Sequence, residues 1–288
     1  MLVAHRALPR TERGPSSSPV PRGSLALMTA AVAGFSVASI VPVGGWTVLL
    51  LLSGVALGGW FVHHERRTAA AVLPSVTFRR SAPLKWIYVA VGVLAFGIGT
   101  EAFIPFFGQE LGGMTPLVAG FLGAALSFGW SVTQVVSANA RTATTVRTVT
   151  VAGPGLLAAG LGVTALLQQE GPATAVAALW FLTLFIAGAG IGLAFPHLAV
   201  AAFGSVADPE EAAKASAGIN TVFLIASAFS SALAGVLVRV GEPSIVSSAQ
   251  YLLGGFAGVA LLGVVPAVVA SRSAARAVSR GAPNRSGV

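Results

Sequence analysis

Long apolar stretches alternate with short polar ones along most of the chain. Because a helix needs about 20 apolar residues to cross a bilayer, eight stretches are predicted as membrane spans, at roughly 25–41, 46–62, 86–107, 117–138, 148–167, 174–195, 217–238 and 248–270. The first two are separated only by the segment 42–45, Pro-Val-Gly-Gly, which predicts a tight helical hairpin because Pro and Gly end helices. The pattern therefore predicts an all-α fold, a polytopic membrane helix bundle of about eight transmembrane helices.

The polar segments divide the chain into five parts. Residues 1–23 are rich in Pro and Ser and have no apolar periodicity, which indicates a disordered cytoplasmic tail or linker. The other parts are a transmembrane helical hairpin at 24–62, a basic cytoplasmic loop at 63–85, a six-helix transmembrane bundle at 86–270 and a cytoplasmic tail at 271–288.

The composition is typical of a membrane protein whose surface faces lipid. Hydrophobic residues are 55% of the sequence and charged residues 9%, with a mean hydropathy of +0.84, whereas soluble domains carry roughly 25% charged residues. The net charge of +8 does not indicate nucleic-acid binding, because the basic residues lie in short segments between apolar runs. The absence of Cys excludes disulfides, thiolate metal sites and cysteine nucleophiles.

The distribution of basic residues predicts the orientation. Of the 17 Lys and Arg, all but Arg239 fall in alternate connections and in the two tails. Loops rich in Lys and Arg stay on the cytoplasmic side. We therefore expect a multi-pass protein of the cell (plasma) membrane with both termini in the cytoplasm.

Polar residues inside the spans are the candidates for a substrate or proton pathway. Glu101 is the one charged residue well inside a predicted span, and intramembrane charges are costly and usually functional. It either faces a central cavity, protonating with transport or attracting a cationic substrate, or lies near the outer interface. Gln134, His197 and Asn220 are further candidates, with helix-packing or interfacial roles as the alternative.

A glycine-rich stretch inside the sixth predicted span has a structural interpretation. Gly188, Gly190, Gly192 and Pro196 superficially resemble a dinucleotide-binding pattern, but no strand precedes them and no acidic residue is placed to bind a ribose. Small residues allow helix backbones to approach closely in lipid. We therefore interpret these residues as a helix-packing motif with a proline bend.

Catalytic and metal-binding patterns are missing from the sequence. It has no nucleophile elbow, no His-Glu-x-x-His zinc motif and no phosphate-binding Gly-Lys-Ser loop. His63 and His64 adjoin charged residues in what we expect to be a solvated loop, so no metal site is predicted. We expect no cofactor and no enzymatic activity.

The order of several segments resembles a known transporter family. The stretch from Gly188 to Pro196, the acidic loop that starts at Asp208, and the run from Ala215 to Thr221 are similar to the antepenultimate span, loop and penultimate span of the fourteen-span drug:proton antiporter branch of the major facilitator superfamily. Residues 61–80 resemble the connection after the eighth span of that family.

The resemblance implies the C-terminal part of such a transporter. The hairpin would be the two extra spans, and residues 86–270 the second six-helix bundle of major facilitator type, without the first bundle. In residues 137–147, Arg141 stands where the family's loop motif has an aspartate, which puts that loop's charge relay in doubt.

Two functions follow as expectations. The first is proton-coupled export of small molecules or drugs, with a small-molecule substrate and the proton as partners, and with a second bundle supplied by another chain or by a homodimer. The alternative is a non-transporting structural or interaction membrane subunit, or a truncated remnant.

Overall fold

The structure, a computed structural model, describes residues 21–68, 71–79, 82–206 and 208–281, and in these ranges it contains helices but no strand. The predicted tail 1–23 lies almost entirely outside the described residues. The helices are α2 (Arg22–Ala38), α3 (Gly45–Glu65), η1 (Ser75–Phe78), α4 (Leu84–Phe96), η2 (Gly97–Thr100), α5 (Ile104–Glu110), α6 (Pro116–Ser137), α7 (Ala143–Leu166), α8 (Thr174–Phe203), α9 (Pro209–Val240), α10 (Ile245–Leu262) and α11 (Val264–Gly281).

Seven helical segments among the described residues are long and apolar enough to cross a membrane, judged by length and composition. Two of them are composite, because α4, η2 and α5 follow one another between Leu84 and Glu110, and α10 continues into α11. The helix α2, with 17 residues, is a shorter apolar helix paired with α3. The prediction of an all-helical, multi-pass bundle with about eight apolar helices is confirmed.

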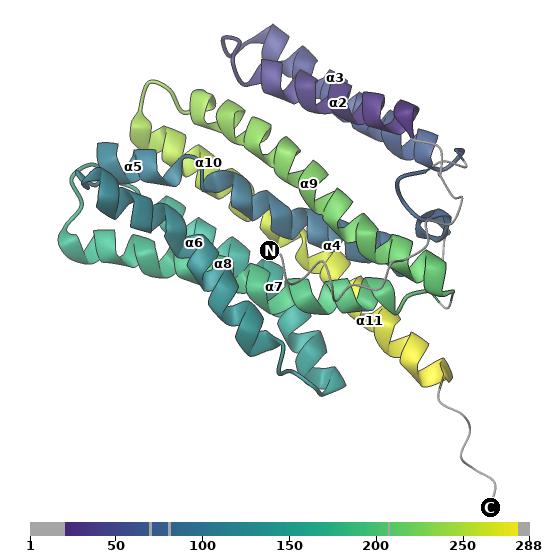
Figure 1. Cartoon of the computed structure of the whole chain (residues 1–288). Helices are drawn as coiled ribbons and strands as arrows, with labels where there is room; N and C mark the ends of the chain where they lie inside the picture. Colours follow the sequence, from purple (N-terminus) through teal and green to yellow (C-terminus); the bar gives the residue numbers. More distant parts are fainter. Residues whose placement is uncertain (1–20, 69–70, 80–81, 207, 282–288) are drawn as a thin grey trace, which may run out of the picture.

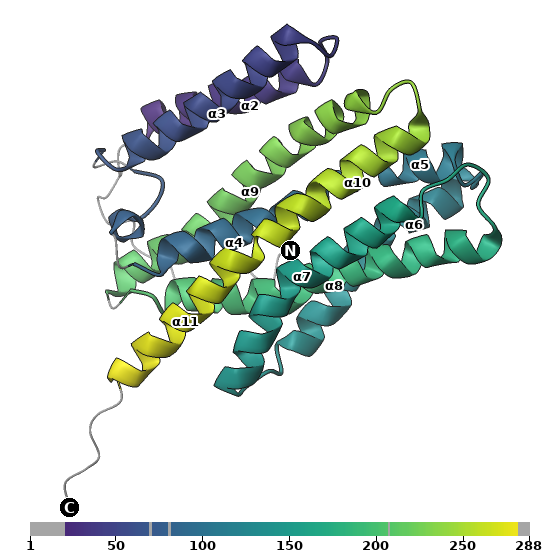
Figure 2. The same ribbon diagram turned by 180° about the vertical axis from the view of Figure 1, so that it is seen from behind.

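The hairpin of α2 and α3 packs on one side of the other helices, along α9 (Figures 1 and 2). The ring of Phe35 in α2 meets the ring of Phe229 in α9 edge to face, with centroids 4.9 Å apart. Arg239 donates a hydrogen bond of 2.7 Å from Nη1 to the backbone oxygen of Ile40 in the hairpin turn. Arg239, the one basic residue outside the alternate connections and tails, therefore links the hairpin to the bundle.

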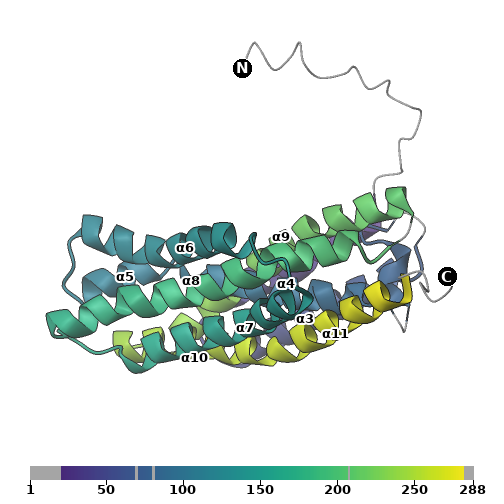
Figure 3. The same ribbon diagram turned by 90° about the horizontal axis from the view of Figure 1, so that it is seen from below.

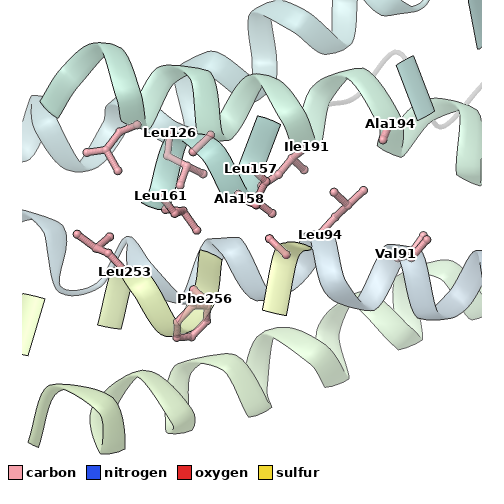
Figure 4. Packing of buried hydrophobic residues seen from close by; sticks show 14 of the residues in the cluster. Val91, Leu94, Leu126, Leu157, Ala158, Leu161, Ile191, Ala194, Leu253 and Phe256 are labelled. Carbon is pink, nitrogen blue, oxygen red and sulfur yellow. The ribbon is translucent and has the colours of Figure 1, made fainter. Parts of the chain in front are cut away.

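Aliphatic and aromatic side chains from the helices α4 to α11 fill the core, and Figure 4 shows part of it. Leu94 of α4, Leu126 of α6, Leu161 of α7 and Ile191 of α8 are fully buried, and Phe256 of α10 is 1% exposed. Within lipid, such contacts act through close packing, since the surrounding acyl chains are as apolar as the side chains themselves.

Glycines bring α8 into backbone contact with two neighbours. A Cβ atom at Gly188 or Gly192 would lie 1.8 Å or 2.2 Å from a backbone oxygen of α6, and one at Gly190 would lie 2.3 Å from a backbone oxygen of α7. Pro196 lies inside α8, which continues to Phe203. The glycines predicted to form a packing motif thus lie at the α6–α8 and α7–α8 interfaces.

The two ends of the bundle differ in charge. One end, called the basic end here, holds the start of α2, the α3–α4, α6–α7 and α8–α9 connections, and the end of α11 (Figures 1 and 3). Of the described Lys and Arg residues, only Arg239 lies at the opposite end, which also carries Glu110, Glu170 and Glu242.

The end of α3 differs from the expectation. His63 and His64 belong to the last helical turn of α3 rather than to a solvated loop, and Glu65 is only 2% exposed. Glu65 accepts a hydrogen bond from the hydroxyl of Ser24 in α2 and one of 2.8 Å from the backbone N–H of Leu73. A buried carboxylate needs such partners, and here they fasten α2, α3 and the following connection together.

Candidate functional site

The third membrane segment is interrupted near its middle. After α4, the chain forms the 3₁₀ turn η2 at Gly97–Thr100 and then turns again before α5. Pro105, in the first turn of α5, has no N–H with which to bond the carbonyl four residues earlier, that of Glu101. Gly97 and Gly99 also have low helix propensity. Glycine and proline together therefore explain why the helix is broken beside Glu101.

The neighbouring helix α9 stabilises the break. Its Ser230 donates a hydrogen bond of 2.7 Å from Oγ to the backbone oxygen of Phe96, and Thr100 donates one of 2.7 Å to the oxygen of Gly97. A Cβ atom at Gly99 would lie 2.0 Å from Ser230 Oγ, so this approach requires glycine. Two carbonyls at the end of α4 thereby gain hydroxyl donors.

Glu101 projects from the break onto α6. It is half-buried, and its Oε1 accepts a hydrogen bond of 2.5 Å from Ser127 Oγ. Ser127 is the twelfth of the 22 residues of α6, so the contact lies near the middle of that helix rather than at its outer end. Among the residues that the structure describes, no Lys, Arg or His lies within ion-pair distance of Glu101.

An aromatic cluster, formed by Trp130 of α6, Phe195 of α8 and Phe223 of α9, begins one helical turn further along. Its ring centroids are 6.1 Å apart for Trp130 and Phe195, 5.9 Å for Trp130 and Phe223, and 5.6 Å for Phe195 and Phe223. All three residues are partly exposed. Trp130 also donates a hydrogen bond of 2.7 Å from Nε1 to Gln134 Oε1. Rings of this kind attract cations to their faces.

The remaining predicted residues lie nearer the basic end. His197 of α8 has its Nε2 2.9 Å from Oγ of Ser137 at the end of α6, and the same hydroxyl is 2.9 Å from the backbone oxygen of Leu193. Asn220 is exposed on α9. Ser127 and Ser137 are ten residues apart on α6, about 15 Å along the axis. Glu101 and His197 thus contact the same helix at separate levels and do not form one cluster.

Sequence reasoning missed most partners of the candidate residues. Ser127 and the aromatic cluster are ordinary residues of apolar spans, and no motif marks them. Ser127 is 26 positions from Glu101, and Ser137 is 60 positions from His197, so only the helix arrangement brings each pair together. The sequence did contain a signal for the helix break, because the helix-disfavouring residues Gly97, Gly99 and Pro105 fall within one predicted span.

No model of a known protein family matches the chain. Over 250 residues, 87% of the chain, it is 43% identical to a protein of Mycobacterium tuberculosis strain CDC 1551 / Oshkosh and equally to one of strain ATCC 25618 / H37Rv, each described as a probable multidrug-efflux transporter. The match covers 53% of each of these proteins. The chain is thus a multi-pass helical membrane protein that spans about half the length of two curated relatives named as efflux transporters.

Proposed function

We propose that this bundle forms one wall of an export pathway for small organic cations, with Glu101 as the carboxylate that attracts the cation or exchanges it for a proton. The observation that carries the proposal is the position of Glu101: at a helix break, beside the middle of α6, with a neutral hydroxyl as its hydrogen-bond partner. A carboxylate in the interior of a membrane protein usually has a functional partner, and broken helices form the binding sites of many transporters.

The aromatic cluster supports a cationic substrate. An organic cation gains from a carboxylate and from ring faces at once, and Trp130 lies three residues after Ser127 on α6. Gln134 and Asn220 would add neutral polar contacts on the exposed sides of α6 and α9. The names of the two tuberculosis relatives support efflux of drugs in general.

The remainder of the pathway belongs to a second six-helix bundle, as in transporters whose two halves rock about a central site. Exposed apolar side chains along α6, among them Leu117, Phe121 and Val135, are 71%, 64% and 72% exposed in this bundle. They offer a face for such a partner, from the same polypeptide, another chain or a second copy. The segment order of the sequence favours the fourteen-span proton-antiporter branch of the major facilitator superfamily.

The membrane orientation is part of the proposal. Lys and Arg residues cluster at the basic end, and such clusters remain on the cytoplasmic side of the plasma membrane. Both ends of the described chain lie at this end. Glu110, Glu170 and Glu242 would then face outward.

Binding of tetraphenylphosphonium to the purified chain in lipid nanodiscs tests the substrate site. We expect Glu101→Gln to weaken binding about tenfold or more, since a charge pair shielded from water contributes at least ~1.5 kcal/mol. Glu170→Gln, at an exposed position in the α7–α8 connection, is the matched control and should bind like the unmodified chain. Equal affinity of the Glu101→Gln variant and the unmodified chain would remove Glu101 from the substrate site.

A further inference from the structure

A cavity separate from Glu101 lies at the basic end between α7, α8 and α11. Its volume is about 350 Å³, and its lining includes Arg141, Arg147 and His197 together with Val146, Leu198 and Ala270. Cationic and apolar side chains thus share one concave surface. The proposed export pathway makes no use of it.

The two arginines supply uncompensated positive charge. Arg141 precedes α7 and Arg147 lies in its second turn, and both residues are exposed. In the part of the chain that the structure describes, neither forms an ion pair with a carboxylate, whereas Glu211 at the same end pairs with Lys214 at 3.2 Å. Arginine guanidinium groups fit phosphate oxygens with paired hydrogen bonds. The cavity is therefore suited to a phosphate group.

The rest of the lining indicates what the phosphate is attached to. Leu198 is 1% exposed and, with Val146 and Ala270, gives the cavity an apolar wall. A small soluble anion gains nothing from that wall, but an acyl chain does. The residues that line the cavity lie toward the ends of three apolar helical segments long enough to cross a membrane, the level at which lipid headgroups meet their chains. Basic pockets between such helices on the cytoplasmic side bind anionic headgroups.

We propose that this cavity is a binding site for one anionic phospholipid. Arg141 and Arg147 hold its phosphate, and an acyl chain lies against Val146 and Leu198. His197 already has Ser137 within hydrogen-bond distance, so the arginines carry the recognition of charge. The bound lipid lies against both α7 and α11, which also pack directly on each other.

Native mass spectrometry of the purified chain in a neutral detergent, titrated with phosphatidylglycerol, tests the headgroup site. We expect one tightly bound lipid, and an affinity about 30-fold or more lower for Arg141→Gln/Arg147→Gln, because two charge-assisted hydrogen bonds are lost. Arg66→Gln/Arg67→Gln is the matched control: it removes the same charge at the same end, outside the cavity, and should stay within about twofold of the unmodified chain. Equal losses in both double variants would overturn the proposal, since they would indicate attraction by net charge alone.

Four further measurements distinguish a lipid from a soluble phosphate and a loss of charge from a loss of folding. Ala201→Trp fills the apolar part of the cavity without changing charge and should also weaken phosphatidylglycerol binding. Glycerol phosphate should compete poorly and phosphatidylcholine should not bind tightly. Full competition by glycerol phosphate together with unchanged binding by Ala201→Trp would contradict a lipid site. Arg141→Lys/Arg147→Lys should recover part of the affinity, and recovery of none would contradict a role for positive charge at these positions.

Discussion

Gly188→Ala places a methyl group where α6 and α8 are in backbone contact. The new Cβ atom would lie 1.8 Å from the backbone oxygen of Leu126, and ordinary van der Waals contact begins at 3.4 Å. The two helices must therefore separate locally by about 1.6 Å, the difference between these two distances. Because the atom in the way is backbone oxygen, rotation of a side chain cannot relieve the clash.

The separation also affects hydrogen bonds between the same helices. Thr133 of α6 donates to the backbone oxygen of Ala189 at 3.1 Å, and Ser137 to that of Leu193 at 2.9 Å. Overpacking a tight contact costs about 1–3 kcal/mol, and each interhelical hydrogen bond in a membrane contributes about 0.6 kcal/mol. We expect a total loss of about 2–4 kcal/mol, which corresponds to a fall in Tm of about 4–16 °C.

Thermal unfolding of the purified chain in one detergent, followed by intrinsic fluorescence at a fixed scan rate, measures this loss. Gly155→Ala in α7 is the matched control, because a Cβ atom at Gly155 meets nothing within 4 Å, and alanine there should be neutral or slightly stabilising. If Gly188→Ala and Gly155→Ala unfold at the same temperature, the close backbone contact of α6 and α8 does not contribute to the stability of the bundle.

Three other expectations follow from the structure. Single cysteines in place of exposed Asn139 and Glu170 should react with an impermeant thiol reagent in intact cells only at Glu170→Cys, and reaction only at Asn139→Cys would reverse the proposed orientation. Ser230→Ala should lower the free energy of unfolding by about 0.5–1 kcal/mol, because the backbone oxygen of Phe96 loses its donor. Ser231→Ala is the control and should lower it less, because the Ser231 hydroxyl bonds within its own helix. Equal effects of the two variants would argue that α9 does not stabilise the helix break. Arg239→Gln should speed hydrogen exchange in the turn between α2 and α3, to which Arg239 donates, and unchanged exchange would show that this bond does not hold the hairpin.

Helix number and type followed from the apolar runs, because a span must satisfy its own backbone hydrogen bonds and therefore has a recognisable length. Helix ends were less predictable. The expected span at 46–62 extends through Glu65, since the carboxylate is held by Ser24, 41 positions away. The α11 helix likewise reaches Gly281, well past the expected end of the last span at 270.

The candidate site was predictable as single residues but not as contacts. Glu101 stands out in the sequence because a charge inside a span is rare, but its partner Ser127 resembles many other serines in apolar helices. The glycine motif was interpreted from spacing alone, and only the packing shows that Gly188 and Gly192 face α6 whereas Gly190 faces α7. Which side of a helix meets which neighbour depends on the arrangement of the whole bundle.

Transport in proteoliposomes tests the central claim, that this bundle is one wall of an export pathway for cations. The samples are the purified chain alone and a chimaera in which the chain replaces the matching 250 residues of a tuberculosis relative, each with an imposed proton gradient and a cationic dye. We predict gradient-dependent dye movement by the chimaera, its loss in the chimaera with Glu101→Gln, and none by the chain alone. Gradient-dependent movement by the chain alone would mean that a second copy supplies the other wall, and unchanged dye movement by the chimaera with Glu101→Gln would contradict the account.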